Sequence, residues 1–135
     1  MKALGQLLRR PGPALGLGLL TLFALKRFAP RCRALVAARY PHQAELARAL
    51  GADEVLPAGP ELRDEVIRRT DARRHQPTLG DSVVLGGADL TFDCVGSAAT
   101  VDEAVRLTRA RGTVVLVGMP SVLKRLEGAA LWFKE

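Results

Sequence analysis

The segment from Gly87 to Pro120 contains two short runs of β-prone residues separated by a stretch with helical spacing. The first run is Ala88–Cys94, the helical stretch is Thr100–Ala110, and the second run is Thr113–Val117. Both runs are mostly apolar, as is typical of parallel strands that are buried on two faces. The connection is long enough for a crossover helix, so the segment predicts a right-handed βαβ unit.

The carboxyl ends of the two predicted strands are the segments Cys94–Ser97 and Val117–Pro120. Ligands of open parallel sheets bind beyond the carboxyl ends of the strands. Because parallel strands end at the same rim of a sheet, we expect these two corners to lie side by side. Asp93 precedes the first corner, and we expect its carboxylate to accept hydrogen bonds from loop amides rather than to act as a base.

The ends of the predicted helix are marked by recognisable residues. Thr100 and Glu103 match a capping box at its start, and Gly112 matches a stop that needs a positive φ. One face carries small and apolar side chains, whereas the arginines fall elsewhere and are expected in solvent. The apolar face is formed by Val101, Ala104, Val105 and Thr108, and the arginines are Arg106, Arg109 and Arg111.

Composition narrows the class of protein. A length of 135 residues suggests one domain, and 48% hydrophobic residues suffice for one modest core. The net charge is +6, but the basic residues are scattered and only 4% of residues are aromatic, so a nucleic-acid partner is not expected. Cys32 and Cys94 are far apart and show no zinc-site spacing, which favours a reduced, cytoplasmic setting and predicts no metal ligands.

The N-terminal part has two competing interpretations. Residues 1–10 are basic, and the mostly apolar run Gly12–Leu25 follows them, which is the order found in signal peptides. The run is shorter than the ~20 residues of a membrane span, so membrane attachment is disfavoured. The other interpretation is a glycine-rich turn that leads into the first helix of a nucleotide-binding unit, with Gly12, Gly16 and Gly18 close to a pyrophosphate. In neither possible alignment do these glycines complete the G-x-G-x-x-G motif of dinucleotide-binding loops.

Strand and helix patterns alternate through the middle of the chain. The predicted elements are a strand at Arg33–Ala38, a helix at Pro41–Leu50 stopped by Gly51, a strand at Ala52–Leu56, a turn at Pro57–Pro60, a helix at Glu61–Arg69, and a loop at Thr70–Gly86 with a short strand at Ser82–Leu85. This alternation predicts an α/β fold with a doubly wound, Rossmann-like parallel sheet.

Three segments occur in an order that resembles a known family. AELARALGADEVL at 44–56, GADLTFDCVGS at 87–97 and RGTVVLVGMP at 111–120 together resemble the cofactor-binding domain of the zinc-type, medium-chain alcohol dehydrogenase family. The resemblance implies a partial dinucleotide-binding domain over residues 12–135, with residues 1–11 unassigned. It also implies an incomplete sheet that lacks the first and sixth strands.

The resemblance further implies which residues contact a cofactor. Relatives that use NAD carry an acidic residue where this chain has Ala38, followed by Arg39 and Tyr40. Arg39 could pair with a 2′-phosphate and Tyr40 could cover the adenine, so NADP is preferred and NAD is the alternative. The competing interpretation is that Arg39 is an ordinary surface arginine at a strand end.

The two strand ends are the other positions implied to contact the cofactor. Cys94, Val95 and Gly96 would lie along it, and Val117, Gly118 and Met119 would approach its nicotinamide. Glycine suits both corners because a side chain would keep a flat ring or ribose from the backbone.

Three functions remain open at this stage. The preferred one is a fragment of an oxidoreductase that supplies the NAD(P)-binding half for hydride transfer between an alcohol and a carbonyl compound. The family's catalytic zinc and its ligands belong to another domain, so we expect no catalytic residue here, no activity alone, and dependence on a separately encoded catalytic domain. The alternatives are a non-catalytic Rossmann-like nucleotide-binding or interaction module, and a small exported or membrane-attached protein.

Overall fold

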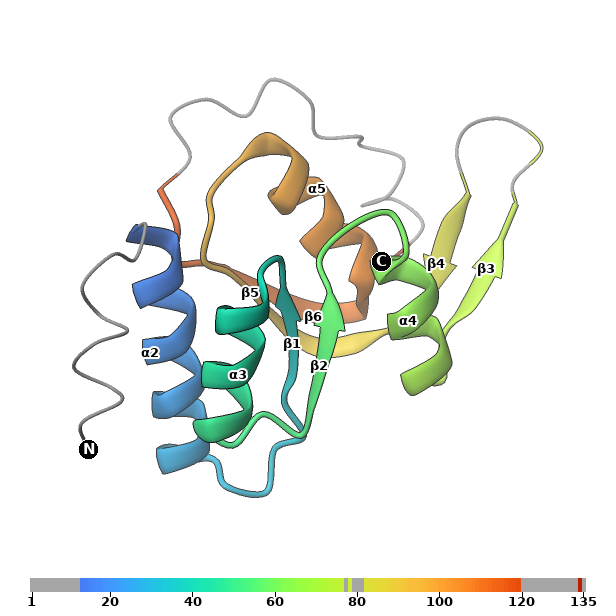
Figure 1. Ribbon diagram of the computed structural model, residues 1–135. Coiled ribbons are helices and arrows are strands. Elements are labelled where there is room, and N and C mark those ends of the chain that lie inside the picture. Colours follow the sequence, from blue (N-terminus) through green and yellow to red (C-terminus); the bar gives the residue numbers. More distant parts are fainter. Residues whose placement is uncertain (1–12, 77, 79–81, 120–133, 135) are drawn as a thin grey trace, which may run out of the picture. The chain divides into compact units, whose positions relative to one another are not determined.

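The structure, a computed structural model, describes residues 13–76, 78, 82–119 and 134 (Figure 1). The chain divides into two compact units, Met1–Val55 and Leu56–Glu135, and each is described by itself. The expectations for residues 1–11 and for Gly12 lie outside the described residues.

The first unit contains helix α2 at Pro13–Phe28, strand β1 at Leu35–Ala38 and helix α3 at Pro41–Ala49, and strand β2 at Glu54–Pro57 begins at its end. Helix α3 packs against α2 and against β1, and β1 pairs with β2 in a two-stranded sheet (Figure 1). The predicted order of elements is confirmed, with shifts of at most two residues at their ends. Gly51 has φ 91° directly after Leu50, the C-cap of α3, which confirms it as the helix stop.

Helix α2 is described from Pro13 to Phe28. Proline is tolerated in the first turn of a helix, because a backbone N–H there would have no acceptor within the helix. Gly16 and Gly18 therefore lie within a helix, and the prediction that they belong to a turn is wrong. None of the described helices combines the length and the apolar character that a membrane span requires.

The core of the first unit is small. Leu22, Ala34 and Ala47 are buried together, and Ala47 is fully inaccessible. Partly buried side chains from the same elements surround them: Leu19, Leu25, Val36, Leu50, Ala52 and Val55.

The second unit contains helix α4 at Leu62–Arg69, strands β3 at Arg73–His75, β4 at Val83–Leu85 and β5 at Ala88–Asp93, helix α5 at Ala98–Leu107, and strand β6 at Thr108–Leu116. Strands β5 and β6 are parallel, and the intervening α5 packs against both (Figure 1). This arrangement confirms the βαβ unit and the mixed α/β fold. Strands β3 and β4 form an antiparallel hairpin. The strand expected at Ser82–Leu85 is present, whereas β3 was not predicted.

Strands β5 and β6 are not buried on two faces, so that expectation is wrong. Leu90 and Leu116 are 40% and 44% exposed. Within the described part of the chain the two strands pair only with each other, which leaves apolar side chains accessible.

The start of α5 differs from the predicted capping box. Ser97, not Thr100, is the N-cap: its hydroxyl accepts from the Thr100 amide at 3.1 Å, and the Thr100 hydroxyl accepts from the Ser97 amide at 3.0 Å. Glu103 does not cap the helix. Both of its carboxylate oxygens instead accept hydrogen bonds from the Arg63 guanidinium of α4, at 2.6–2.9 Å.

The end of α5 also differs. The helix stops at Leu107, and β6 begins at once, with extra residues between Thr108 and Thr113 relative to β5. The positive φ belongs to Arg111, at 57°, not to Gly112. Gly112 is instead required by close packing, because a Cβ there would lie 2.5 Å from Cγ2 of Thr108 and 2.9 Å from the carbonyl oxygen of Asp89.

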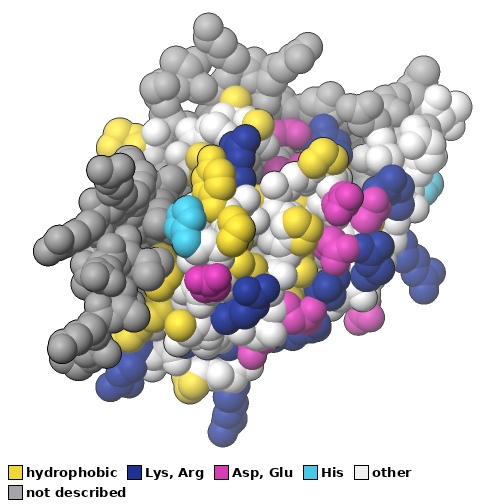
Figure 2. All heavy atoms as spheres, viewed as in Figure 1, with side chains coloured by type: hydrophobic (Ala, Val, Ile, Leu, Met, Phe, Trp, Pro, Cys, Tyr) yellow, Lys and Arg dark blue, Asp and Glu magenta, His cyan; other side chains and the backbone are white. Residues whose placement is uncertain are grey.

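The predicted exposure of the arginines is wrong for Arg106, which is 5% exposed and whose Nε donates to Asp102 at 2.7 Å. Arg109 and Arg111 are exposed as expected. In Figure 2, basic and acidic side chains lie next to one another over α4, where Arg68 and Arg69 both pair with Glu65.

Candidate functional site

The two predicted corners meet at one rim of the parallel strands. Asp93, the last residue of β5, pairs with Leu116, the last residue of β6. Immediately beyond, the amides of Val117 and Gly118 both donate to the carbonyl oxygen of Asp93, at 2.8 and 2.9 Å. The expectation that the corners lie side by side is confirmed.

The two corners touch through their backbones. A Cβ on Gly118 would lie 2.5 Å from the Gly96 nitrogen and 2.5 Å from the Val95 carbonyl carbon. A Cβ on Gly96, whose φ is 75°, would lie 2.8 Å from the Gly118 carbonyl carbon and 2.9 Å from the Met119 nitrogen. Real Cβ contacts are not this short, so each glycine is needed for the approach of the other corner. This is a reason for glycine that the sequence did not reveal.

The carboxylate of Asp93 fixes the first corner. Its Oδ1 accepts from the Val95 amide at 3.0 Å, and the Gly96 amide is shared between Oδ1 at 3.3 Å and Oδ2 at 3.2 Å. The Thr100 hydroxyl also donates to Oδ2, at 3.2 Å. Asp93 is only 5% exposed, so its charge is held within the corner. The expectation that Asp93 accepts from loop amides is confirmed.

The side chains of the two corner segments are uncharged. Val95 is 55% exposed and Met119 is 93% exposed, whereas Gly118 is buried and Cys94 is half-buried outside any disulfide. No charged residue occurs from Cys94 to Val101 or from Thr113 to Met119. Such a surface can support a flat ring or a sugar, but it offers no exposed acid or base.

The third predicted group of residues, Ala38 to Tyr40, lies at the end of β1 in the first unit. The Gln43 side-chain oxygen accepts from the amides of Arg39 and Tyr40, at 2.9 and 3.2 Å. The Tyr40 ring stacks on His42 with centroids 5.6 Å apart. The side chains of Arg39, Tyr40 and His42 are exposed.

Sequence reasoning missed Gln43 and the stacking role of His42. The signal for Gln43 was present, because a glutamine three residues after a helix N-cap is a capping-box residue. It missed Ser97 for a different reason, since Ser97 and Thr100 are both acceptable caps and only their hydrogen bonds distinguish them.

The structure thus brings together Cys94 to Gly96 and Val117 to Met119. The Ala38–Tyr40 strand end belongs to the other unit and is described separately, and Gly16 and Gly18 lie in α2. Within the described ranges there is no group of three or more His, Cys, Asp and Glu side chains that could hold a metal ion.

Residues 16–135 match the model of a protein family described as zinc-binding dehydrogenase. Among curated proteins, the chain is similar to sorbitol dehydrogenase of Arabidopsis thaliana, with 31% identity over 103 residues. That match covers 76% of this chain and 26% of the relative, so the chain spans about a quarter of the relative's length.

Solved structures share the fold. D-arabinose dehydrogenase from Sulfolobus solfataricus superposes with a TM-score of 0.69 at 24% identity, over 88% of this chain and 32% of that one. A Sinorhizobium meliloti structure, described as a zinc-binding dehydrogenase bound to NADP, gives a TM-score of 0.60 at 28% identity, over 86% of this chain and 31% of that one.

Proposed function

Because this chain belongs to the zinc-binding dehydrogenase family, we propose that it supplies the dinucleotide-binding half of an oxidoreductase acting on alcohols or polyols. The part of the family to which the chain corresponds is the NAD(P)-binding domain. The observation that carries the proposal is the pair of neutral corners in contact at one rim of a parallel βαβ unit, where ligands of such sheets bind.

The residues at the corners fit the nicotinamide end of a dinucleotide. The corner segments carry no carboxylate beyond Asp93, so their own side chains do not repel an anionic cofactor. The carboxylate of Asp93 is buried and occupied by hydrogen-bond donors. When bound, the cofactor supplies the carbon that gives or accepts hydride, and the chain's role is to orient it.

The strand end at Ala38 to Tyr40 fits the adenosine end. Ala38 presents no carboxylate to repel a 2′-phosphate, and the neighbouring Arg39 side chain is exposed. A guanidinium can bind phosphate through two parallel hydrogen bonds, so NADP is the proposed cofactor and NAD is the weaker one. The similar Sinorhizobium meliloti structure is bound to NADP, which supports the same choice.

The described residues do not fit a zinc site, because they offer no cluster of metal-ligating side chains. We therefore assign no zinc-dependent step to this chain. A catalytic domain other than the one described would provide the group that polarises the carbonyl oxygen. A non-catalytic nucleotide-binding module is the second candidate, favoured by the same lack of a ligand cluster among the described residues.

Titration of the chain with NADPH and NADH tests the proposal, using the fluorescence of the reduced nicotinamide as the readout. We expect saturable binding of both, with NADPH tighter. A chain that is folded by circular dichroism and binds neither cofactor would overturn it. Alcohol or polyol oxidation upon addition of a zinc-containing catalytic domain would favour the dehydrogenase over the non-catalytic module.

A further inference from the structure

We propose that Asp93 is the positioning residue for the nicotinamide end of the cofactor. This inference rests on the proposed function. Asp93 would act through the backbone of the two corners rather than by touching the cofactor, because it is 5% exposed and its hydrogen-bonding groups face inward.

One residue holds both corners. The Asp93 carboxylate accepts from the Val95 and Gly96 amides of the first corner, at 3.0–3.3 Å. Its main-chain carbonyl accepts from the Val117 and Gly118 amides of the second, at 2.8 and 2.9 Å. Asp93 is therefore hydrogen-bonded to both corners.

The packing brings the backbones of the two corners into close contact. Gly96 and Gly118 face each other so closely that a methyl group on either one would meet backbone atoms at 2.5–2.9 Å. Loss of the Asp93 carboxylate would leave the amides of Val95 and Gly96 without their hydrogen-bond acceptor, so the first corner could shift. Because a bound ring must contact both corners at once, a shift of the first corner would reduce ring binding even if the sheet remained folded.

The hydrogen-bond pattern requires an acceptor at both oxygens. Oδ1 receives two amide N–H groups, and Oδ2 receives the shared Gly96 amide and the Thr100 hydroxyl. An ionised carboxylate accepts at both oxygens, and such charge-assisted bonds are stronger than neutral ones. An asparagine would turn an N–H toward one of these donors.

Thr100 extends the same network into the helix. Its hydroxyl lies 3.2 Å from Oδ2 of Asp93 and also accepts from the amide of Ser97, the N-cap of α5. The residues that hold the first corner are thereby joined to the start of the helix that packs on both strands. A Thr100→Val variant removes this hydroxyl, and with it the bonds to Asp93 and to the Ser97 amide, while leaving the Asp93 carboxylate in place.

The adenosine end provides an internal reference. The amides of Arg39 and Tyr40 are held by Gln43, a residue of the other unit. A change at Asp93 that acts by positioning should weaken only the nicotinamide end. A change that unfolds the protein should weaken both ends.

The test compares wild type, Asp93→Asn, Thr100→Val and the control Asp89→Asn. Asp89 is at the other end of the same strand, and its side chain is 85% exposed. Two affinities are measured on the full chain: that for NADPH by nicotinamide fluorescence, and that for the adenosine half of NADP supplied alone, by competition. Hydrogen exchange at the amides of Val95 and Gly96 reports the corner without any ligand.

We expect Asp93→Asn to weaken NADPH binding about tenfold, with faster exchange at both amides and unchanged affinity for the adenosine half. Thr100→Val should have a smaller effect in the same direction, and Asp89→Asn should match wild type. Equal losses for NADPH and for the adenosine half would overturn the inference, and so would unchanged NADPH affinity in both corner variants. A wild-type chain that binds neither ligand would instead reject the proposed function.

Discussion

The corners at the ends of β5 and β6 and the strand end at Ala38 to Tyr40 are built in opposite ways. The corners are held by a buried carboxylate and by backbone contacts that only glycine allows. The strand end is held by one glutamine side chain, and its arginine, tyrosine and histidine side chains are exposed.

This difference separates two kinds of recognition. Binding at the corners depends on the position of backbone atoms, so almost any substitution there should change stability and binding together. Binding at the strand end depends on the chemical identity of exposed side chains, so substitutions there should change the choice of cofactor and leave stability nearly unchanged. The predictions below test that separation.

The largest effect is expected for Gly118→Ala. The added Cβ would lie 2.5 Å from backbone atoms of Gly96 and Val95, which cannot move without breaking hydrogen bonds to Asp93. We expect the free energy of unfolding, measured by urea denaturation, to fall by about 3 kcal/mol or more. Gly59→Ala is the matched control in the same unit, because a Cβ there meets nothing within 4 Å. Similar denaturation midpoints for both variants would contradict tight corner packing.

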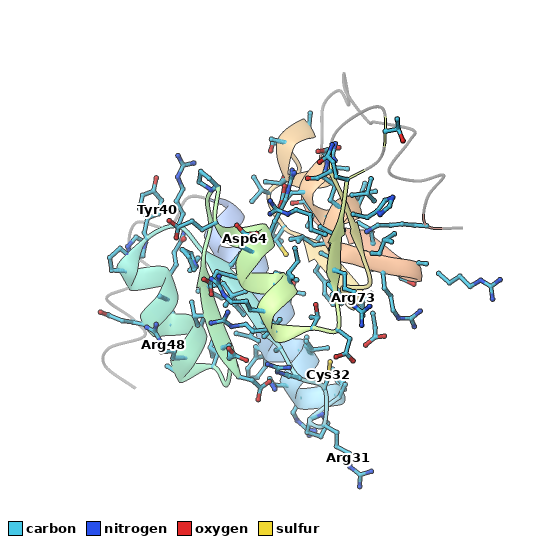
Figure 3. The ribbon with its side chains drawn as sticks, turned by 90° about the vertical axis from the view of Figure 1, so that its right-hand side faces the viewer. Arg31, Cys32, Tyr40, Arg48, Asp64 and Arg73 are labelled. Carbon is cyan, nitrogen blue, oxygen red and sulfur yellow. The ribbon has the colours of Figure 1, made fainter. Side chains whose placement is uncertain are left out.

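The next effect concerns cofactor choice at Arg39. Arg39→Asp places a carboxylate beside the proposed 2′-phosphate, so the ratio of NADPH to NADH affinity should fall about 10- to 100-fold. The denaturation midpoint should not change, because the side chain is exposed. Arg48→Asp is the charge-matched control, since Figure 3 shows Arg48 farther along α3 from Tyr40. An unchanged affinity ratio would leave Arg39 as an ordinary surface arginine.

The position of the two corners at one rim could be predicted from the sequence, whereas the hydrogen bonds within them could not. Two β-prone runs joined through a helix must form parallel strands that end at one rim, and this placed Gly96 near Gly118. The sequence could not show that Ser97 is the N-cap of α5, because threonine, the residue at position 100, is also a common N-cap residue. The Thr100 hydroxyl is instead shared with Asp93, a contact that exists only in the folded corner.

The end of the strand at Ala38 was predicted correctly, but the hydrogen-bond partners of the next residues were not. An apolar run followed by Pro41 marks the start of a helix, which placed Arg39 and Tyr40 at a strand end. Elsewhere the errors share one cause, since tertiary contacts replaced a local pattern. Gly112 resembled a helix stop but is required by contact with Thr108 and Asp89, and β3 is a basic segment that is a strand only through its pairing with β4.

A third prediction uses a buried charge of the second unit. The ammonium of Lys134 donates to the carbonyl oxygens of Val105 at 2.9 Å and Arg106 at 2.6 Å, and also to that of Thr108, at the end of α5. Burial, and to a smaller extent the Arg106 guanidinium, lowers the pKa of Lys134 from 10.5 to about 8. Between pH 8 and 10.5 the unfolded chain therefore binds more protons at this site than the folded chain does.

The free energy of unfolding contributed by Lys134 should consequently rise as the pH increases from about 8 to 10.5, and should not change with pH below that window. Urea denaturation across this range, compared between wild type and Lys134→Met, isolates the contribution. The wild-type free energy of unfolding minus that of Lys134→Met should therefore rise with pH. If this difference falls instead, the three carbonyl oxygens stabilise the charged ammonium more than burial destabilises it.

The smallest effect is expected in the first unit, at Asp53, and it should have a different pH window. Hydrogen bonds from the Lys26 ammonium at 2.5 Å and from the Ala34 amide at 2.6 Å lower the pKa of Asp53 below its usual 3.8. The folded state thus favours the carboxylate, so the stability from this site is present above pH 3.8 and is lost as the pH falls through the lowered pKa.

Asp53→Asn should remove the loss of stability at acidic pH that comes from this carboxylate. The free energy of unfolding, measured by urea denaturation from neutral to acidic pH, tests this. The effect should also shrink in high salt, because the Asp53 side chain is 43% exposed and exposed ion pairs are screened. At Lys134, where the interacting groups are buried, salt should change the wild-type difference curve much less. Equal salt sensitivity at the two sites would contradict the difference in burial between Lys134 and Asp53.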